Sequence, residues 1–220
     1  MPNLVGIFGG TFDPVHNGHT ETIRSLLNLI TFKEIRVIPN GIPPHRPSVI
    51  ASTSERLQMV SMAFNSLNNI VVDDREIKRR GPSYAIDTAK EVINLYDSCS
   101  SICWIMGTDA FSSIDSWHRW EEFLDLVNII VMNRPDKTID KNSIPYKILK
   151  ERQIDNKEDF ISSKKGKVLS IKVRPVKVSS SKIRHNIFSG KPVDEMIFQE
   201  VAGFIERTKL YIEKNDSFKD

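Results

Sequence analysis

The chain has 220 residues, of which 40% are hydrophobic, and this is enough for one α/β domain with a substantial core. It carries 31 Lys and Arg against 28 Asp and Glu, and the net charge of +3 is too mild to indicate a nucleic-acid partner. The first residues lack the pattern of a secretory signal, and the apolar run 126–132 contains Asn128 and is too short to cross a membrane. We therefore expect a cytoplasmic protein without a membrane or nucleic-acid partner.

Short apolar runs alternate with helical patterns along the chain. The predicted strands cover residues 4–8, 34–38, 70–72, 102–106, 129–132 and 168–173. The predicted helices cover residues 18–30, 54–66, 84–96, 120–125, 181–189 and 198–213. This βαβ alternation predicts a Rossmann-like, doubly wound and mostly parallel α/β sheet with helices on both faces.

Residues 135–166 interrupt this alternation. They are polar and contain Pro135 and Pro145, so we interpret them as a polar insertion with one helix near 146–153. Residues 1–213, which include this insertion, are predicted to form a single domain. Residues 214–220 are predicted to be a flexible C-terminal tail.

The two cysteines, Cys99 and Cys103, are four residues apart and have no histidine cluster beside them. A zinc site needs about four ligands, and a secreted disulfide scaffold needs more cysteines. We expect two reduced thiols and no metal ion held by side chains alone.

Polar loops follow every predicted strand. In an open parallel sheet, ligands bind outside the carboxyl ends of the strands, so these loops are expected to meet at one site. The loops cover residues 9–19, 39–46, 73–84, 107–109, 133–135 and 179–184.

The loop after the first strand reads Gly-Gly-Thr-Phe-Asp-Pro-Val-His-Asn-Gly-His over residues 9–19. It has neither the glycine spacing of a dinucleotide fingerprint nor the Gly-Lys-Ser/Thr of a P-loop. Gly9, Gly10 and Thr11 offer backbone donors, and a helix that begins here points its positive end at an anion. His16 and His19 lie on one face of that helix, so both imidazoles can reach one phosphate chain.

A second candidate anion site begins at Ser179. Ser179, Ser180 and Ser181 offer hydroxyl and backbone donors at the start of a predicted helix, and Arg184 lies one turn further on. An ordinary serine-rich helix cap with a solvated arginine is the alternative interpretation.

Several further side chains near the strand ends have two interpretations each. Trp117 and Trp120 are either core residues or, for one of them, a stacking plate for a cationic ring. Asp109, after Gly107, either accepts hydrogen bonds from a ribose or base, or caps a helix. His45 and Arg46 are either an exposed basic loop or a phosphate grip on a second substrate.

These motifs resemble a known family. Residues 9–19 resemble the signature of the nucleotidyltransferases with a His-x-Gly-His motif, and residues 179–184 resemble their Ser-Ser-Thr-x-Ile-Arg signature with Ser181 in place of threonine. Further segments are similar to bacterial nicotinate-nucleotide adenylyltransferases. They are residues 38–40, 43–46, 75–77, 82–84 and 107–109, Trp117, and residues 134–135.

The resemblance implies transfer of AMP from ATP to nicotinate mononucleotide, giving nicotinate adenine dinucleotide and pyrophosphate in NAD biosynthesis. It implies that His16, His19 and Arg184 are catalytic, and that Mg²⁺ is carried by the ATP phosphates. The implied ATP-binding residues are Gly9, Gly10, Thr11, Phe12, Gly107, Asp109, Arg134, Ser179 and Ser180. The implied residues for the mononucleotide are Asn40, His45, Arg46, Tyr84, Thr88, Trp117 and His118.

The chain departs from the family pattern at Ala85, where Ser-Tyr-Thr becomes Ser-Tyr-Ala. Thr88, or backbone donors near Trp117 and His118, are expected to replace the missing hydroxyl. Two other functions stay open. One is another nucleotidyltransferase, with a nicotinamide mononucleotide or phosphopantetheine acceptor or with cytidylyl transfer. The other is a non-catalytic nucleotide-binding or RNA-binding module. The oligomeric state is also open.

Overall fold

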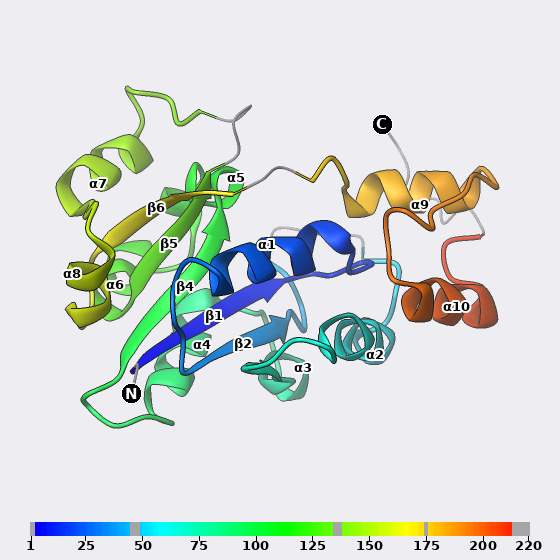
Figure 1. Cartoon of the computed structure of the whole chain (residues 1–220), viewed down its shortest axis with the longest axis horizontal. Coiled ribbons are helices and arrows are strands. Elements are labelled where there is room, and N and C mark those ends of the chain that lie inside the picture. Colours follow the sequence, from blue (N-terminus) through cyan, green and yellow to red (C-terminus); the bar gives the residue numbers. More distant parts are fainter. Residues whose placement is uncertain (1–2, 45–48, 134–137, 174–175, 213–220) are drawn as a thin grey trace.

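The computed structural model describes residues 3–44, 49–133, 138–173 and 176–212. In this part of the chain, six strands form one sheet in the order β3-β2-β1-β4-β5-β6, and every neighbouring pair is parallel (Figure 1). The predicted doubly wound fold is confirmed. The strands are β1 (Leu4–Gly10), β2 (Glu34–Pro39), β3 (Ile70–Val72), β4 (Ser101–Gly107), β5 (Asn128–Asn133) and β6 (Val168–Lys172).

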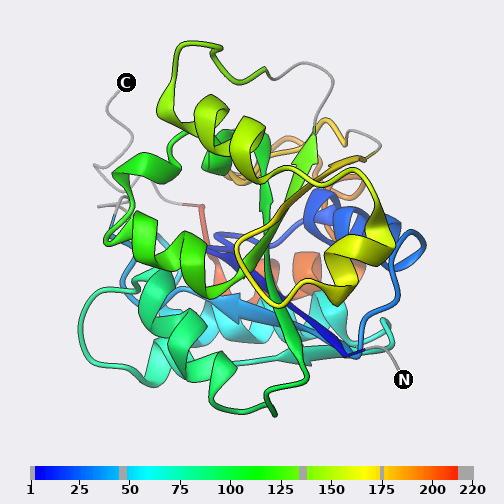
Figure 2. The same cartoon turned by 90° about the vertical axis from the view of Figure 1, so that its left-hand side faces the viewer.

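Helices cover both faces of this sheet, as Figure 2 shows. Side chains alternate across each strand, so Leu4 and Phe8 of β1 join one hydrophobic cluster while Val5 and Ile7 join the other. The first cluster is covered by α1 (Asn17–Leu27), α2 (Thr53–Phe64), α8 (Lys157–Ser162), α9 (Ser180–Phe188) and α10 (Gln199–Thr208). The second is covered by α4 (Ala85–Ile93), α5 (Thr108–Phe111), α6 (Trp120–Leu126) and α7 (Ile144–Arg152).

The direction in which successive strands are added to the sheet reverses between β1 and β4. From β1 the order runs through β2 to β3 on one side, and from β4 it runs through β5 to β6 on the other. A doubly wound sheet has its binding crevice where this reversal occurs, outside the carboxyl ends of the two central strands. The fold therefore places the ends of β1 and β4, at Gly10 and Gly107, on either side of a crevice.

The structure corrects two predicted helices. Helix α2 starts at Thr53 rather than Ser54, because the side chains of Ser52 and Glu55 form a reciprocal capping box. The segment 135–166 contains two described helices, α7 and α8, rather than one. Phe160 of α8 is fully buried against the sheet, so this polar segment also contributes to the core.

A buried amide joins that segment to the sheet. Asn128, at the start of β5, is fully buried. Its Nδ2 donates to the carbonyl oxygen of Ser163 at 2.7 Å and to Oγ of Ser101 at 3.0 Å, and its Oδ1 accepts from the backbone N–H of Lys167 at 2.9 Å. One side chain thus satisfies three polar groups from β4 and from the segment before β6.

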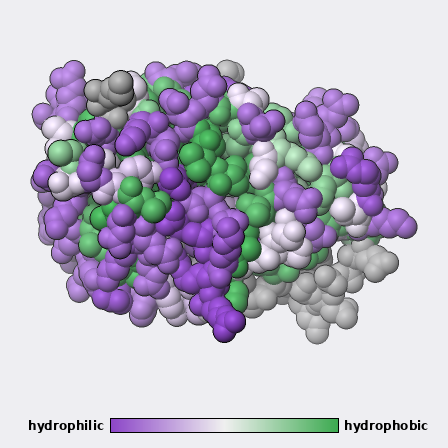
Figure 3. Space-filling model, turned by 90° about the horizontal axis from the view of Figure 1, so that it is seen from below, coloured by the Kyte–Doolittle hydropathy of each residue, from purple (hydrophilic) through white to green (hydrophobic). Residues whose placement is uncertain are grey.

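The surface carries only scattered large hydrophobic side chains. In the view of Figure 3 the face is mostly hydrophilic, with hydrophobic side chains gathered near its middle.

Within the described ranges, no helix has the length and apolar character that a membrane span requires. Cys99 is exposed and Cys103 is buried, and both are free thiols as expected. Among the described residues, the exposed large hydrophobic ones are Leu29, Ile42, Leu95, Ile144, Phe188 and Ile212.

Candidate active site

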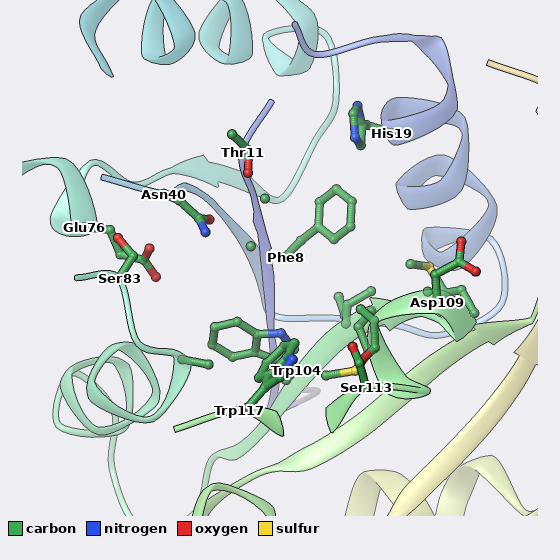
Figure 4. Close-up of a pocket in the computed structure, with 18 of the residues that line it drawn as sticks. Phe8, Thr11, His19, Asn40, Glu76, Ser83, Trp104, Asp109, Ser113 and Trp117 are labelled. Atoms are coloured by element: carbon green, nitrogen blue, oxygen red, sulfur yellow. The ribbon is translucent and has the colours of Figure 1, made fainter. Parts of the chain in front are cut away.

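A cavity of about 660 Å³ opens at the crevice between β1 and β4. Figure 4 shows His19 and Asp109 on one side, with Asn40, Glu76 and Ser83 grouped on the opposite side. Trp104 and Trp117 lie between the two sides. Such a volume suits a nucleotide-sized ligand. Of the residues predicted from sequence, those that line it are Gly9, Gly10, Thr11, His19, Asn40, Tyr84, Gly107, Asp109, Trp117 and His118.

The backbone at the end of β1 lines the cavity because its glycines allow close packing. A Cβ atom on Gly9 would lie 3.1 Å from the Trp104 ring, and one on Gly10 would lie 2.9 Å from the Phe12 ring. Phe12 itself has a positive φ of 52°, is 2% exposed and does not line the cavity. Its ring packs edge to face against His19 at 5.0 Å between centroids, and the contact with ATP that the sequence predicts for Phe12 stays a prediction.

His16 and His19 form a stacked pair at the start of α1. Their ring centroids are 3.7 Å apart, and the backbone N–H of His16 donates to Nδ1 of His19 at 3.1 Å. Because Nδ1 is an acceptor, the neutral His19 ring carries its proton on Nε2, where it is a hydrogen-bond donor. His19 lines the cavity, whereas His16 is 5% exposed and lies behind it.

The loop between β1 and α1 is anchored by Asp13. This carboxylate is 3% exposed and accepts from the backbone N–H groups of Ile50 and Ala51, at 2.9 and 3.0 Å, and from the Tyr211 hydroxyl at 2.7 Å. Burial, together with the nearby charge of Asp13, raises the pKa of Tyr211, so its hydroxyl remains a donor. The loop is thus attached to residues distant in sequence.

Helix α9 holds the same loop from another direction. Nη1 of Arg184 donates to the carbonyl oxygen of Asp13 at 2.7 Å, and Oγ of Ser180 donates to that of Pro14 at 2.9 Å. Ser179 caps α9 by accepting from the backbone N–H of Lys182. These three residues do not line the cavity, so the contact with phosphate that the sequence predicts for them stays a prediction.

Aromatic rings line the cavity between these two sides and next to Ser83. Trp117 is half-buried, and its ring meets that of Trp104 edge to face at 6.2 Å, whereas Tyr84 stacks on His118 at 4.2 Å. Trp117 is therefore packed against the core and also presented to the cavity, which combines the two interpretations offered by the sequence. Trp120 does not line the cavity.

A buried carboxylate lies beside these rings. Glu76, in α3 (Arg75–Lys78), is 3% exposed, and its Oε1 accepts from the Thr88 hydroxyl at 2.6 Å. Burial raises the pKa of Glu76, although hydrogen bonds from Thr88 and Ser83 oppose this change. Thr88 is fully buried, and its hydroxyl also accepts from Nη1 of Arg79 at 3.0 Å. Thr88 does not line the cavity, so the contact with the mononucleotide that the sequence predicts for it stays a prediction.

The structure does not describe three of the predicted residues, which are His45, Arg46 and Arg134. Asp109 lies inside the first turn of α5, whose cap position is Gly107, so the helix-cap interpretation of Asp109 is wrong. Among the described ranges, no three or more His, Cys, Asp or Glu side chains are grouped closely enough to hold a metal ion.

Comparisons with known proteins agree with this geometry. The model of the cytidylyltransferase-like family matches residues 7–186. The chain is 35% identical to a probable nicotinate-nucleotide adenylyltransferase of Pseudomonas entomophila over 96% of both chains. It is equally identical to that of Coxiella burnetii, over 94% of this chain and 98% of the other. The chain belongs to the nicotinate-nucleotide adenylyltransferase family.

Solved structures share the fold of this nicotinate-nucleotide adenylyltransferase family member. A Plasmodium falciparum nicotinic acid mononucleotide adenylyltransferase complexed with NaAD superposes with a TM-score of 0.73 at 20% identity, over 95% of this chain and 97% of that one. A putative nicotinate-nucleotide adenylyltransferase from Vibrio parahaemolyticus gives a TM-score of 0.63 at 18% identity, over 96% and 97%.

Trp104, Glu76 and Ser83 are among the residues that line the cavity but were not predicted as site residues. Trp104 lies within a run of buried residues along β4 and therefore resembles a purely structural tryptophan. Glu76 and Ser83 fall in a polar loop region in which no single residue stands out. The available signal was their position after β3, on the same sheet edge as the other polar loops.

Proposed function

We propose that the protein transfers AMP from ATP to nicotinate mononucleotide, forming nicotinate adenine dinucleotide and pyrophosphate in NAD biosynthesis. The observation that carries this proposal is that one cavity combines glycine backbone and the His19 imidazole with the aromatic rings of Trp117 and Tyr84. A triphosphate suits the first set of groups and a pyridinium ring suits the second. The family of the chain supports the same reaction.

In this reaction, a phosphate oxygen of the mononucleotide attacks the α-phosphorus of ATP, and the bond to the bridging oxygen of pyrophosphate breaks. Phosphoryl and nucleotidyl transfers depend on alignment and charge stabilisation more than on a protein nucleophile. The Nε2–H of His19 would donate to the α-phosphate as its charge grows, with His16 stacked behind it. Arg184 and Ser180 would hold the loop that aims these rings.

The metal that we propose is Mg²⁺, carried by the phosphates of ATP. Mg²⁺ prefers oxygen ligands in an octahedron and would neutralise the phosphate charge when bound. Asp13 does not suit such an ion as a ligand, because its two oxygens already accept from Ile50, Ala51 and Tyr211. The triphosphate itself supplies the oxygens that this ion prefers.

The acid form of the acceptor is supported by the start of α4. Tyr84, which stacks on His118, is the cap residue of this helix, and its side chain makes no capping hydrogen bond. Ala85 lines the cavity. The positive end of the helix would therefore meet the nicotinate carboxylate, in place of the hydroxyl that Ala85 lacks. We further propose that residues 1–213 act as one domain.

The test is pyrophosphate release with ATP and Mg²⁺ and each of three acceptors: nicotinate mononucleotide, nicotinamide mononucleotide and phosphopantetheine. We expect turnover with the first to exceed the others, and chelation of the metal with EDTA to abolish it. ATP binding without turnover on any acceptor would identify a nucleotide-binding module instead. Turnover with phosphopantetheine alone would identify a different nucleotidyltransferase.

A further inference from the structure

Arg56 is a buried cation beneath the two loops that line the cavity. It lies in the first turns of α2 and is 1% exposed. Its Nη1 donates to the carbonyl oxygen of Thr11 at 2.8 Å, and its Nη2 donates to that of Gly41 at 3.2 Å. Its Nε donates to that of Ala51 at 3.3 Å. One guanidinium therefore joins three chain segments, two of which, at Thr11 and Gly41, are distant from Arg56 in sequence.

Arg56 carries a buried charge that is held mainly by carbonyl groups. Burial lowers the pKa of Arg56, and the nearby carboxylate of Asp13 opposes this through space. Each oxygen of Asp13 already accepts hydrogen bonds from other groups. Removing the guanidinium would leave three carbonyl groups without this donor, so Arg56 also stabilises the fold. A positioning role is therefore distinguished from a structural one by kinetics and not by stability.

The two outer carbonyls follow neighbouring strand ends at the edge of the cavity. Thr11 follows β1 and lines the cavity, and Gly41 follows Asn40, which lines it beyond the end of β2. The N–H of Asn40 donates to the carbonyl oxygen of Gly10 at 2.9 Å, so Arg56 joins two segments that already lie side by side. Gly41 is held closely from the other direction, since its N–H donates to Oγ of Ser83 at 2.9 Å. A Cβ atom on Gly41 would lie 2.2 Å from the carbonyl oxygen of Glu76. Both loops are thus fixed to the planar fork of Arg56, whose donors have a set spacing.

We propose that Arg56 is a positioning residue that fixes the Thr11 and Gly41 segments beyond the ends of β1 and β2, and through them aligns the two substrates. The identities of the two substrates rest on the proposed function. Arg56 touches neither substrate in this arrangement and acts through the carbonyl groups of Thr11 and Gly41. Misplacement of reacting groups by about 1 Å can lower a rate by about 10²-fold. Loss of Arg56 is therefore expected to lower kcat more than it changes the KM for either substrate.

The test compares Arg56→Lys and Arg56→Met with the matched control Met59→Ala. Lysine keeps the charge but has one nitrogen, which cannot span the carbonyls of Thr11 and Gly41. Met59 is fully buried one turn further along α2 and has no N–H donor for the carbonyls of either loop, so its truncation destabilises the same helix without removing those hydrogen bonds. We expect both Arg56 variants to lose about 30-fold or more in kcat, with less than about threefold change in either KM. Met59→Ala is expected to lower Tm but to keep the kcat of folded protein.

Calorimetry supplies a readout that does not require turnover. The dinucleotide product spans both subsites, so its affinity is expected to fall about tenfold or more in Arg56→Lys, while the affinities of a non-hydrolysable ATP analogue and of the mononucleotide change less than about threefold. Arg56→Lys serves if Arg56→Met does not fold. Wild-type kcat in Arg56→Lys, or an equal loss of kcat in Met59→Ala, would overturn the proposal. A wild-type protein that binds the dinucleotide without catalysing the reaction would contradict the proposed function but leave the binding comparison intact.

Discussion

The two sides of the cavity are built from different kinds of groups. The side at the end of β1 consists of glycine backbone and the His19 imidazole, held from behind by buried hydrogen bonds to Asp13. The opposite side holds the buried carboxylate of Glu76, and aromatic rings line the cavity next to it. From this difference we infer that the phosphates of ATP are bound by oriented N–H groups, whereas the mononucleotide is recognised by shape and by ring stacking.

The largest expected effect comes from removing the imidazole on the first side. His19→Ala is expected to lower kcat by about 10²–10³-fold, which is the usual effect of losing a donor aimed at developing charge. Steady-state pyrophosphate release at saturating substrates measures it. The control is His185→Ala, which removes an exposed histidine of α9. A loss below about threefold in His19→Ala would show that the two sides do not differ in the way described.

Gly41→Ala tests the backbone packing on the second side. The new Cβ atom would lie 2.2 Å from the carbonyl oxygen of Glu76, so the loop or α3 must move. We expect a loss of about 1–3 kcal/mol in unfolding free energy, measured by urea denaturation, together with a raised KM for the acceptor. Gly107→Ala is the control for stability, because no atom lies within 4 Å of its added Cβ. Equal stability of the two variants would contradict the close approach at Gly41.

Trp117→Ala tests the aromatic rings directly. Loss of a cation–π contact with the pyridinium ring is expected to raise the KM for the acceptor about tenfold while leaving the KM for ATP unchanged. Trp117→Phe, which keeps an aromatic face, is expected to recover most of the affinity. Initial rates with each substrate varied in turn separate the two constants. An equal rise in the KM for ATP would mean that Trp117 serves both substrates.

The smallest expected effect concerns the buried carboxylate. Because burial raises the pKa of Glu76 above its ordinary 4.5, the native state binds more protons than the unfolded state just above that pH. The stability that Glu76 contributes is therefore present below pH 4.5 and falls as pH rises through its native pKa. Glu76→Gln is expected to remove this fall, seen in urea midpoints between about pH 4 and 8. The control is Glu206→Gln, an exposed position on α10. An unchanged pH profile would contradict the shift.

The sequence predicts the scaffold better than it predicts the contacts. The six strands are found close to where the apolar runs place them, because strands of a parallel sheet are buried on both faces and read as continuous apolar segments. The glycines and histidines of residues 9–19 stand out because their chemistry is unusual in a short loop. Arg56 was missed because it occupies a polar position in an ordinary helical pattern, and its three carbonyl partners are brought together only by tertiary structure.

Thr88 shows a contact that the sequence did not suggest. Its position one turn beyond Ala85 suggested a substitute hydroxyl, but α4 turns that hydroxyl into the core, where Glu76 and Arg79 bind it. Ser180 and Arg184 contact the carbonyls of Pro14 and Asp13, partners that their own loop does not reveal. Spacing along a helix predicts the face on which a residue lies, but it does not predict which group from elsewhere in the fold will be its hydrogen-bond partner.

The buried amide of Asn128 has a consequence for any attempt to shorten the chain. Residues 138–162 look dispensable in the sequence because they are polar and lie far from the cavity. Deleting them along with Ser163 would remove the carbonyl oxygen that Asn128 binds and leave a polar atom without water at the start of β5. Such an orphaned group costs about 1–3 kcal/mol, before the loss of Phe160 from the core is counted. A minimal version of this protein would need a new acceptor for Asn128 as well as a shorter loop, because Asn128 must still accept from the backbone N–H of Lys167.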